Sequence, residues 1–176
     1  MRRLKSLWFS LVVMLAPLPA EAALKVGQMA PDFTAPATLG GKEFTFSLSQ
    51  ALKQGPVVVY FYPAAFTKGC TVEAHEFAAA MPDFKASGAS VIGVSADSIQ
   101  TLDKFSVSEC QSKFPVASDA SRAIMSSYDA KVPLLGFAKR TSYVIGQDGK
   151  LRFAYSDMDP EGHVSGTLAA VRKLKN

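Results

Sequence analysis

The stretch from residue 57 to residue 80 constrains the fold more than any other part of the chain. It opens with six consecutive β-branched or aromatic residues, 57–62, in which apolar and polar positions do not alternate. Such a run predicts a strand covered on both faces, as in the central sheet of an α/β protein. Pro63 ends the strand because it has no backbone N–H for a neighbouring strand. A short turn containing Gly69 follows, and the pattern then becomes helical.

Cys70 lies where this helix begins. A thiol in the first turn of a helix is close to unpaired backbone N–H groups and to the positive end of the helix dipole, and both stabilise a thiolate. We therefore expect Cys70 to be reactive. Pro63 would form a compact apolar wall near the sulfur. Thr67 precedes Cys70 by three residues, a spacing from which its hydroxyl can cap the helix or reach a molecule bound above the sulfur.

Together these residues form the pattern Pro63-x-x-x-Thr67-x-x-Cys70, with Glu73 three residues further on. The pattern resembles the signature of the peroxiredoxins, which are thiol peroxidases built on a thioredoxin fold. The residues beside it are similar to the bacterioferritin-comigratory (PrxQ) branch, and the resemblance extends from about residue 27 to residue 171. It implies an α/β, thioredoxin-like fold, in which a central mixed sheet is flanked by helices and carries the peroxiredoxin insertions.

The periodicity of the other segments fits that arrangement, with a βαβ unit first and a ββα unit last. The expected elements are a hairpin within 24–46, a short helix at 47–54, a helix from 70 to about 87 with a break at 81–83, a strand at 89–95, a helix from 99 to about 113 that contains Cys110, a helical turn around 122–128, a hairpin of 141–145 and 150–155, and a last helix that starts at 159–160.

Residues 1–22 have the three parts of a secretory signal peptide. Arg2, Arg3 and Lys5 form a positive start, an apolar core at 7–16 follows, and small residues precede the expected cleavage site after Ala22. The apolar core is too short to span a bilayer. We therefore expect export to the periplasm, by either the general secretory or the twin-arginine route, and a single domain at 23–176.

Charge and composition exclude several classes of function. Cleavage would lower the formal net charge from +4 to +2, since the leader carries three basic residues and one acidic residue. No basic cluster with interleaved aromatic residues is present, which argues against nucleic-acid binding. No other run is long enough for a transmembrane helix, so we expect no membrane attachment after cleavage. His75 and His163 lack a metal-ligand spacing to either cysteine, so no metal or other cofactor is expected.

Cys70 and Cys110 are the only two cysteines. In an exported chain such a pair normally forms a structural disulfide, and from the cysteines alone that interpretation is favoured. The pattern around Cys70 reverses it, because an inert disulfide does not require proline and threonine around one sulfur. The resemblance implies that Cys70 is the peroxidatic cysteine. Its thiolate would reduce hydrogen peroxide or an organic hydroperoxide, become a sulfenic acid and then need a second thiol.

The resemblance also points to the second thiol. In part of the branch it lies five residues after the first, where this chain has His75; in other members it lies some forty residues on, which matches Cys110. We therefore expect Cys110 to be the resolving cysteine and to form a disulfide within the chain. Both helices would unwind locally, because a disulfide needs Cα atoms within roughly 7 Å. Such a mechanism does not require a dimer, so we expect a monomer, reduced by a thioredoxin-like or glutaredoxin-like thiol protein.

Two alternatives remain open. One is a one-cysteine peroxidase in which Cys110 is a bystander and an external thiol resolves Cys70. The other is a non-enzymatic thioredoxin-fold protein with a structural disulfide between Cys70 and Cys110.

Arg140 is the remaining catalytic candidate. Peroxiredoxins keep an arginine just before a strand of the late hairpin, and the resemblance places Arg140 there. Its permanent charge would favour the thiolate, and its N–H groups would bind the peroxide oxygens. Glu73 lies on the same helical face as Cys70 and could hold Arg140 in place, although a solvated carboxylate is the alternative. Arg122 is a weaker alternative for the arginine.

Overall fold

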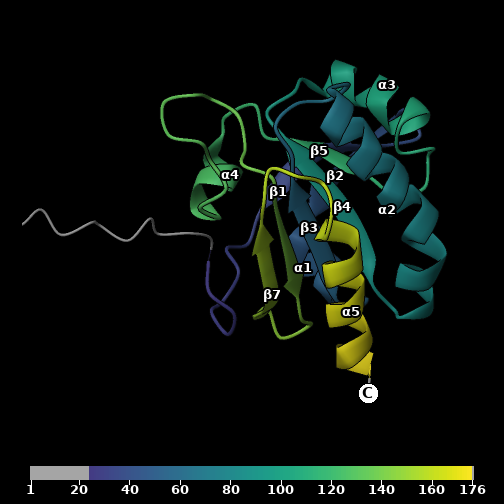
Figure 1. Cartoon of the computed structure of the whole chain (residues 1–176), viewed down its shortest axis with the longest axis vertical. Coiled ribbons are helices and arrows are strands. Elements are labelled where there is room, and N and C mark those ends of the chain that lie inside the picture. Colours follow the sequence, from purple (N-terminus) through teal and green to yellow (C-terminus); the bar gives the residue numbers. More distant parts are fainter. Residues whose placement is uncertain (1–23, 176) are drawn as a thin grey trace, which may run out of the picture.

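The computed structural model of the protein describes residues 24–175. The predicted signal peptide lies outside the described residues. Within 24–175 the chain forms one seven-stranded mixed sheet with helices on both of its faces (Figure 1). The predicted α/β, thioredoxin-like architecture is therefore confirmed.

The sheet has the strand order β2-β1-β5-β4-β3-β6-β7. Its strands are β1 Thr34–Leu39, β2 Lys42–Ser47, β3 Val57–Phe61, β4 Ser90–Ser95, β5 Val116–Ser118, β6 Thr141–Ile145 and β7 Leu151–Ser156. Strands β3, β4 and β5 run parallel to one another, whereas the hairpins β1–β2 and β6–β7 pair antiparallel at the two edges. The expected βαβ and ββα units are both present.

All five residues of the central strand β3 are buried, which explains the unbroken apolar run in the sequence. Val58 and Tyr60 face one hydrophobic cluster, and Val57, Val59 and Phe61 face the other. Successive side chains of a strand point to opposite faces of the sheet. When both faces are covered, no position faces solvent, so apolar and polar residues do not alternate along the strand.

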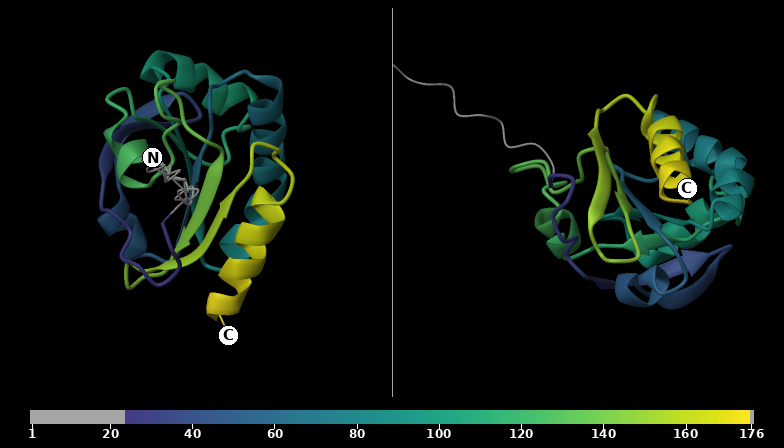
Figure 2. Two further views of the ribbon diagram at one scale, coloured as in Figure 1. Left: turned by 60° about the vertical axis from the view of Figure 1, so that its left-hand side comes forward. Right: turned by 90° about the horizontal axis from the view of Figure 1, so that it is seen from below.

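Five helices cover the sheet within the described part of the chain. They are α1 Leu48–Leu52, α2 Lys68–Ala86, α3 Ile99–Ser108, α4 Ala123–Ser127 and α5 His163–Lys175. Helices α2, α3 and α5 pack on the face of Tyr60, and α1 and α4 pack on the opposite face. Figure 2 shows α2 and α5 side by side along the sheet.

Two predictions about α2 and α5 are wrong. Helix α2 passes through Pro82 without the expected break. Pro82 is exposed, while Met81 and Phe84 beside it are buried, so packing of the inner face keeps the helix continuous across the proline. The last helix begins at His163 and not at Pro160, because Gly162 has a φ of 89°, which no helical residue can adopt.

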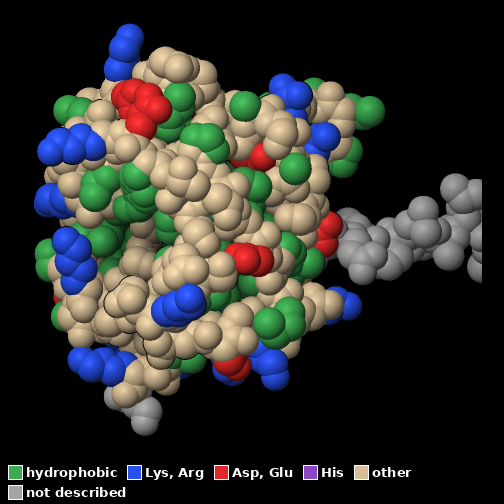
Figure 3. All heavy atoms as spheres, turned by 180° about the vertical axis from the view of Figure 1, so that it is seen from behind, with side chains coloured by type: hydrophobic (Ala, Val, Ile, Leu, Met, Phe, Trp, Pro, Cys, Tyr) green, Lys and Arg blue, Asp and Glu red, His purple; other side chains and the backbone are tan. Residues whose placement is uncertain are grey.

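On the face seen in Figure 3, Lys and Arg side chains lie mainly around the edge of the molecule, and a few acidic side chains are scattered among hydrophobic and other residues. Of the helices within residues 24–175, none has the length and apolar character needed to cross a membrane.

Candidate active site

Cys70 occupies the first turn of α2, directly after the end of the central strand β3. Strand β3 ends at Phe61, and a short loop that begins with the half-buried Pro63 connects it to α2. This connection places Cys70 near the end of the central strand. The Cys70 side chain is 1% exposed, and its thiol is free. The predicted strand, turn and helix are thus all present, with the thiol buried in the first turn of the helix.

Thr67 is the N-cap residue of α2, with φ −76° and ψ 149°. Its hydroxyl does not cap the helix, however. It donates to the carbonyl of Ala64 at 3.0 Å, and the Thr67 side chain is exposed at the rim of the site. Because a hydroxyl oxygen that donates once keeps its acceptor sites, Thr67 can still accept a hydrogen bond from a molecule bound above the sulfur.

Asp97 holds the loop that precedes Cys70. Its Oδ2 accepts from the backbone N–H of Ala65 at 2.8 Å and from Oγ of Ser95 at 2.7 Å. Phe66, the next residue of the loop, has a φ of 63°, a left-handed conformation that is uncommon for a residue with a large side chain. The contact from Asp97 therefore stabilises a loop whose backbone is strained.

Arg140 lies against the sulfur, at the end of the loop that leads into β6. Its side chain is buried, and its Nη2 donates to Cys70 Sγ at 3.6 Å. Nε of Arg140 donates to the carbonyl of Met158 at 3.1 Å, and Nη1 donates to Oε2 of Glu73. Burial lowers the pKa of Arg140, but Glu73 and Cys70 raise it by more, so the guanidinium stays charged.

Gly69 leaves room for this arrangement. A Cβ at residue 69 would lie 3.0 Å from Nη2 of Arg140, closer than ordinary van der Waals contact. The backbone beside Cys70 therefore approaches the guanidinium directly.

Glu73 is fully buried one turn after Cys70. Burial raises the pKa of Glu73 to about 8, although Arg140 lowers it through its charge and its hydrogen bond. Oε1 of Glu73 has no hydrogen-bond partner within residues 24–175. The alternative of a solvated carboxylate is therefore excluded, and Glu73 is one of the contacts that hold Arg140 against Cys70.

Cys110 is also free and fully buried. The prediction that it lies within a helix is wrong. Helix α3 ends at Ser108, and Gln111 and Ser112 have left-handed φ values of 52° and 55°. These two residues turn the chain, so Cys110 sits in the turn that follows the helix. Its backbone N–H donates to the carbonyl of Phe105 at 3.0 Å.

The Cys110 thiol belongs to the same hydrophobic cluster as Cys70, which also contains Tyr60 and Tyr62. Burial raises the pKa of Cys110 well above its usual range. In this conformation Cys110 is therefore a protonated thiol and a poor nucleophile.

Comparison with known proteins identifies the family to which this arrangement belongs. The AhpC/TSA family matches residues 26–154 of the chain. The chain belongs to this family and is a peroxiredoxin. It is 34% identical over 174 residues to the chloroplastic peroxiredoxin Q of Oryza sativa subsp. japonica, which covers 90% of this chain and 78% of the relative.

Solved structures agree with that assignment. Peroxidoxin BcpB from Mycobacterium tuberculosis superimposes with a TM-score of 0.79 at 33% identity, covering 87% of this chain and 99% of that one. Peroxiredoxin Q from Xanthomonas campestris has a TM-score of 0.70 at 29% identity, covering 80% and 91% of the two chains.

Arg122, the weaker candidate for the catalytic arginine of this peroxiredoxin, makes its hydrogen bond outside the Cys70 site. Nε of Arg122 donates to the carbonyl of Gly136 at 2.8 Å, in the loop that precedes β6. Of the arginines in residues 24–175, Arg140 is the one that hydrogen-bonds to Cys70.

His75 makes a contact that sequence reasoning missed. Its Nε2 lies 3.0 Å from Oε2 of Glu109, the residue directly before Cys110. This contact links α2 to the segment that carries the second thiol. Within residues 24–175 no group of three His, Cys, Asp or Glu side chains is arranged to hold a metal ion.

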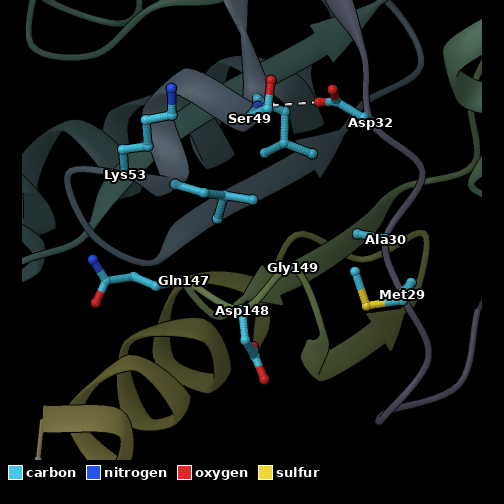
Figure 4. A pocket seen from close by; sticks show the side chains of 10 residues that line it. Met29, Ala30, Asp32, Ser49, Lys53, Gln147, Asp148 and Gly149 are labelled. Carbon is cyan, nitrogen blue, oxygen red and sulfur yellow. Dashed lines mark hydrogen bonds between the residues drawn. The ribbon is translucent and has the colours of Figure 1, made fainter.

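A hollow of about 310 Å³ in this peroxiredoxin is not part of the site. Figure 4 shows it between α1, the residues around Met29 and the β6–β7 turn at Gly149. Val57 pairs with Ile145 at that end of the sheet, whereas Phe61 pairs with Thr141, beside Arg140, at the other end. The hollow and Cys70 therefore lie at opposite ends of the central strand.

Proposed function

We propose that this peroxiredoxin, a thiol-dependent peroxidase, uses Cys70 as its peroxidatic cysteine. The Cys70 thiolate attacks the terminal oxygen of a hydroperoxide, and the O–O bond breaks. The released oxygen takes a proton and leaves as water or an alcohol, and Cys70 becomes a sulfenic acid. The observation that carries this proposal is the hydrogen bond of 3.6 Å from Arg140 Nη2 to Cys70 Sγ at the start of a helix.

Arg140 and Thr67 supply the polar contacts for the peroxide. A guanidinium beside the sulfur favours the thiolate and offers N–H groups to the oxygen atoms between which the bond breaks. The exposed hydroxyl of Thr67 accepts the hydrogen of the peroxide from the rim, and Pro63 supplies an apolar wall. The site takes no cofactor in this scheme, because the reducing electrons come from thiols.

Cys110 resolves the sulfenic acid in our proposal. Its sulfur attacks the Cys70 sulfur, a disulfide forms, and the sulfenic oxygen leaves as water. Both thiols are buried, and each lies in a segment held by backbone hydrogen bonds, so we propose that the first turn of α2 and the turn after α3 open as the disulfide forms. The hydrogen bond from the Cys110 N–H to Phe105 and the contact of His75 with Glu109 are the interactions that such opening would break.

A dithiol protein of the thioredoxin or glutaredoxin type then reduces the disulfide. Because the disulfide closes within one chain, the cycle needs no second subunit, and we propose a monomer. We further propose that residues 1–22 are a cleaved signal peptide and that the enzyme works in the periplasm, where its reductant must be supplied separately from the cytosolic thiol pool.

One observation favours the one-cysteine alternative. Cys110 is fully buried, and its thiol is held in the protonated form. If the turn after α3 does not open, an external thiol would have to resolve Cys70.

Peroxide turnover with a thioredoxin-type reductant separates these cases. Cys70→Ser should abolish consumption of hydrogen peroxide. Cys110→Ser should still consume one equivalent in a single turnover but lose steady-state turnover. Full steady-state activity of Cys110→Ser would establish the one-cysteine mechanism, and full activity of Cys70→Ser would refute the peroxidatic assignment.

A further inference from the structure

His163 is a buried polar residue to which the proposed reaction assigns no role. It is the first residue of α5 and is fully buried. Its Nε2 lies 3.0 Å from the carbonyl oxygen of Asp157, and its Nδ1 lies 2.8 Å from Oγ of Ser142 on β6. Both ring nitrogens are therefore engaged, from two different elements.

These contacts define the protonation of the ring. A carbonyl oxygen can only accept, so Nε2 carries the hydrogen. Burial lowers the pKa of His163 and favours the neutral imidazole, in which Nδ1 accepts from the hydroxyl of Ser142. The titratable and charged groups that face the ring are Arg140, Asp157, Asp159 and Glu73, and the ring of Tyr155 packs against it at 4.7 Å between centroids.

His163 is connected to Arg140 along two routes. The first runs through the loop between β7 and α5, because Asp157 binds Nε2 of His163 through its carbonyl and the next carbonyl, of Met158, accepts from Nε of Arg140. The second runs through Glu73. Oε1 of Glu73 lies 3.8 Å from Nδ1 of His163, and Oε2 accepts from Arg140.

We propose that His163 is a positioning residue that fixes Arg140 against the Cys70 sulfur, by anchoring the Asp157–Met158 carbonyls and by packing against the Glu73 carboxyl. The inference rests on the proposed function, since Arg140 matters only if Cys70 is the reacting group. The Met158 carbonyl accepts from Nε of Arg140, and the Glu73 carboxyl accepts from Nη1. With these two nitrogens held in place, the direction of the third, Nη2, toward the Cys70 sulfur is fixed.

The geometry distinguishes three substitutions. His163→Gln can keep an N–H near the position of Nε2 and so retain the bond to Asp157. His163→Asn keeps a polar group near Nδ1 but does not reach Asp157. His163→Leu fills similar space and loses both contacts. Thr167→Val is the matched control, because Thr167 is buried one turn further along α5 and its hydroxyl donates to the backbone carbonyls of His163 and Val164, so the change removes a buried hydroxyl and leaves both contacts of the imidazole ring in place.

The test measures peroxide consumed in a single turnover by the reduced full-length protein, over a range of pH. His163→Leu should lower the second-order rate constant about tenfold and move the midpoint of the rate–pH curve upward, because a displaced guanidinium stabilises the reacting anion less. His163→Gln should recover most of the rate, and Thr167→Val should match the wild type.

Two outcomes would overturn the inference. One is a rate and a pH midpoint in His163→Leu that equal those of the wild type. The other, should His163→Leu fail to fold by circular dichroism, is a folded His163→Asn whose rate and pH midpoint equal those of the wild type. A wild type that consumes no peroxide would instead refute the proposed function.

Discussion

Replacing Glu73 with glutamine should remove a pH dependence of stability that originates in one buried carboxyl. Glu73 is fully buried, and burial raises its pKa from 4.5 to about 8. In the unfolded chain the side chain ionises near 4.5, so between pH 4.5 and 8 the folded state holds a proton that the unfolded state has lost. The free energy of unfolding of the wild type therefore falls as pH rises through this window.

The pKa difference sets the size of the effect. Each pKa unit corresponds to about 1.4 kcal/mol, so the difference between 4.5 and about 8 gives a loss of about 5 kcal/mol across the window at most. Glutamine has nearly the same shape and can still accept from Arg140, but it does not titrate. The difference in unfolding free energy between Glu73→Gln and the wild type should thus grow in favour of the variant as pH rises.

Urea denaturation of the reduced proteins at several pH values between 5 and 8.5 measures this difference directly. His163 has a lowered pKa, so its neutral form adds stability above pH 6.5 that is lost as pH falls. His163 lies 3.8 Å from Glu73, so the comparison relies on the part of the range above pH 6.5, where the neutral imidazole is favoured in the folded and the unfolded chain. Curves that stay parallel, or a wild type that gains on the variant as pH rises, would mean that Arg140 keeps Glu73 ionised and would refute the reasoning.

Three further predictions concern the contacts around the site. Arg140→Lys keeps the charge but replaces three separate donor nitrogens with one ammonium nitrogen, which cannot reach Met158, Glu73 and Cys70 from a single position. The single-turnover rate with hydrogen peroxide should therefore fall about tenfold; an unchanged rate would argue against a role for the planar guanidinium. Asp97→Ala removes the acceptor for the Ala65 N–H and should cost about 1–3 kcal/mol in urea unfolding and speed hydrogen exchange of that amide; unaltered exchange would contradict it. His75→Ala breaks the contact with Glu109 and should speed disulfide formation, followed by mass spectrometry, up to about fivefold without changing the peroxide step, whereas slower disulfide formation would count against local opening.

Much of the fold follows from local patterns in the sequence. The unalternating strand β3 indicated a sheet covered on both faces, and the turn at 146–149 indicated the β6–β7 hairpin. Cys70 could be placed in the first turn of a helix because proline, glycine and the helical pattern lie next to one another. These features depend on neighbours in the chain, which is why they could be predicted.

The missed features depend on contacts between distant residues. Asp97 and His163 have no motif of their own, and their importance comes from Ala65 and from Asp157 and Ser142, which reach them only in the folded sheet. The end of α3 before Cys110 was missed because its left-handed residues carry no glycine as a signal. Pro82 predicts a break on local grounds, whereas the buried inner face that keeps α2 continuous across it is formed only in the folded protein.

Mass spectrometry of the reduced protein after one equivalent of hydrogen peroxide, on wild type and Cys110→Ser in parallel, decides whether Cys70 and Cys110 are the reacting pair. The wild type should lose two hydrogens as Cys70 and Cys110 form a disulfide, and the variant should carry a sulfenic or more highly oxidised Cys70. An unmodified Cys70 in both proteins would contradict the assignment of Cys70 as the peroxidatic cysteine.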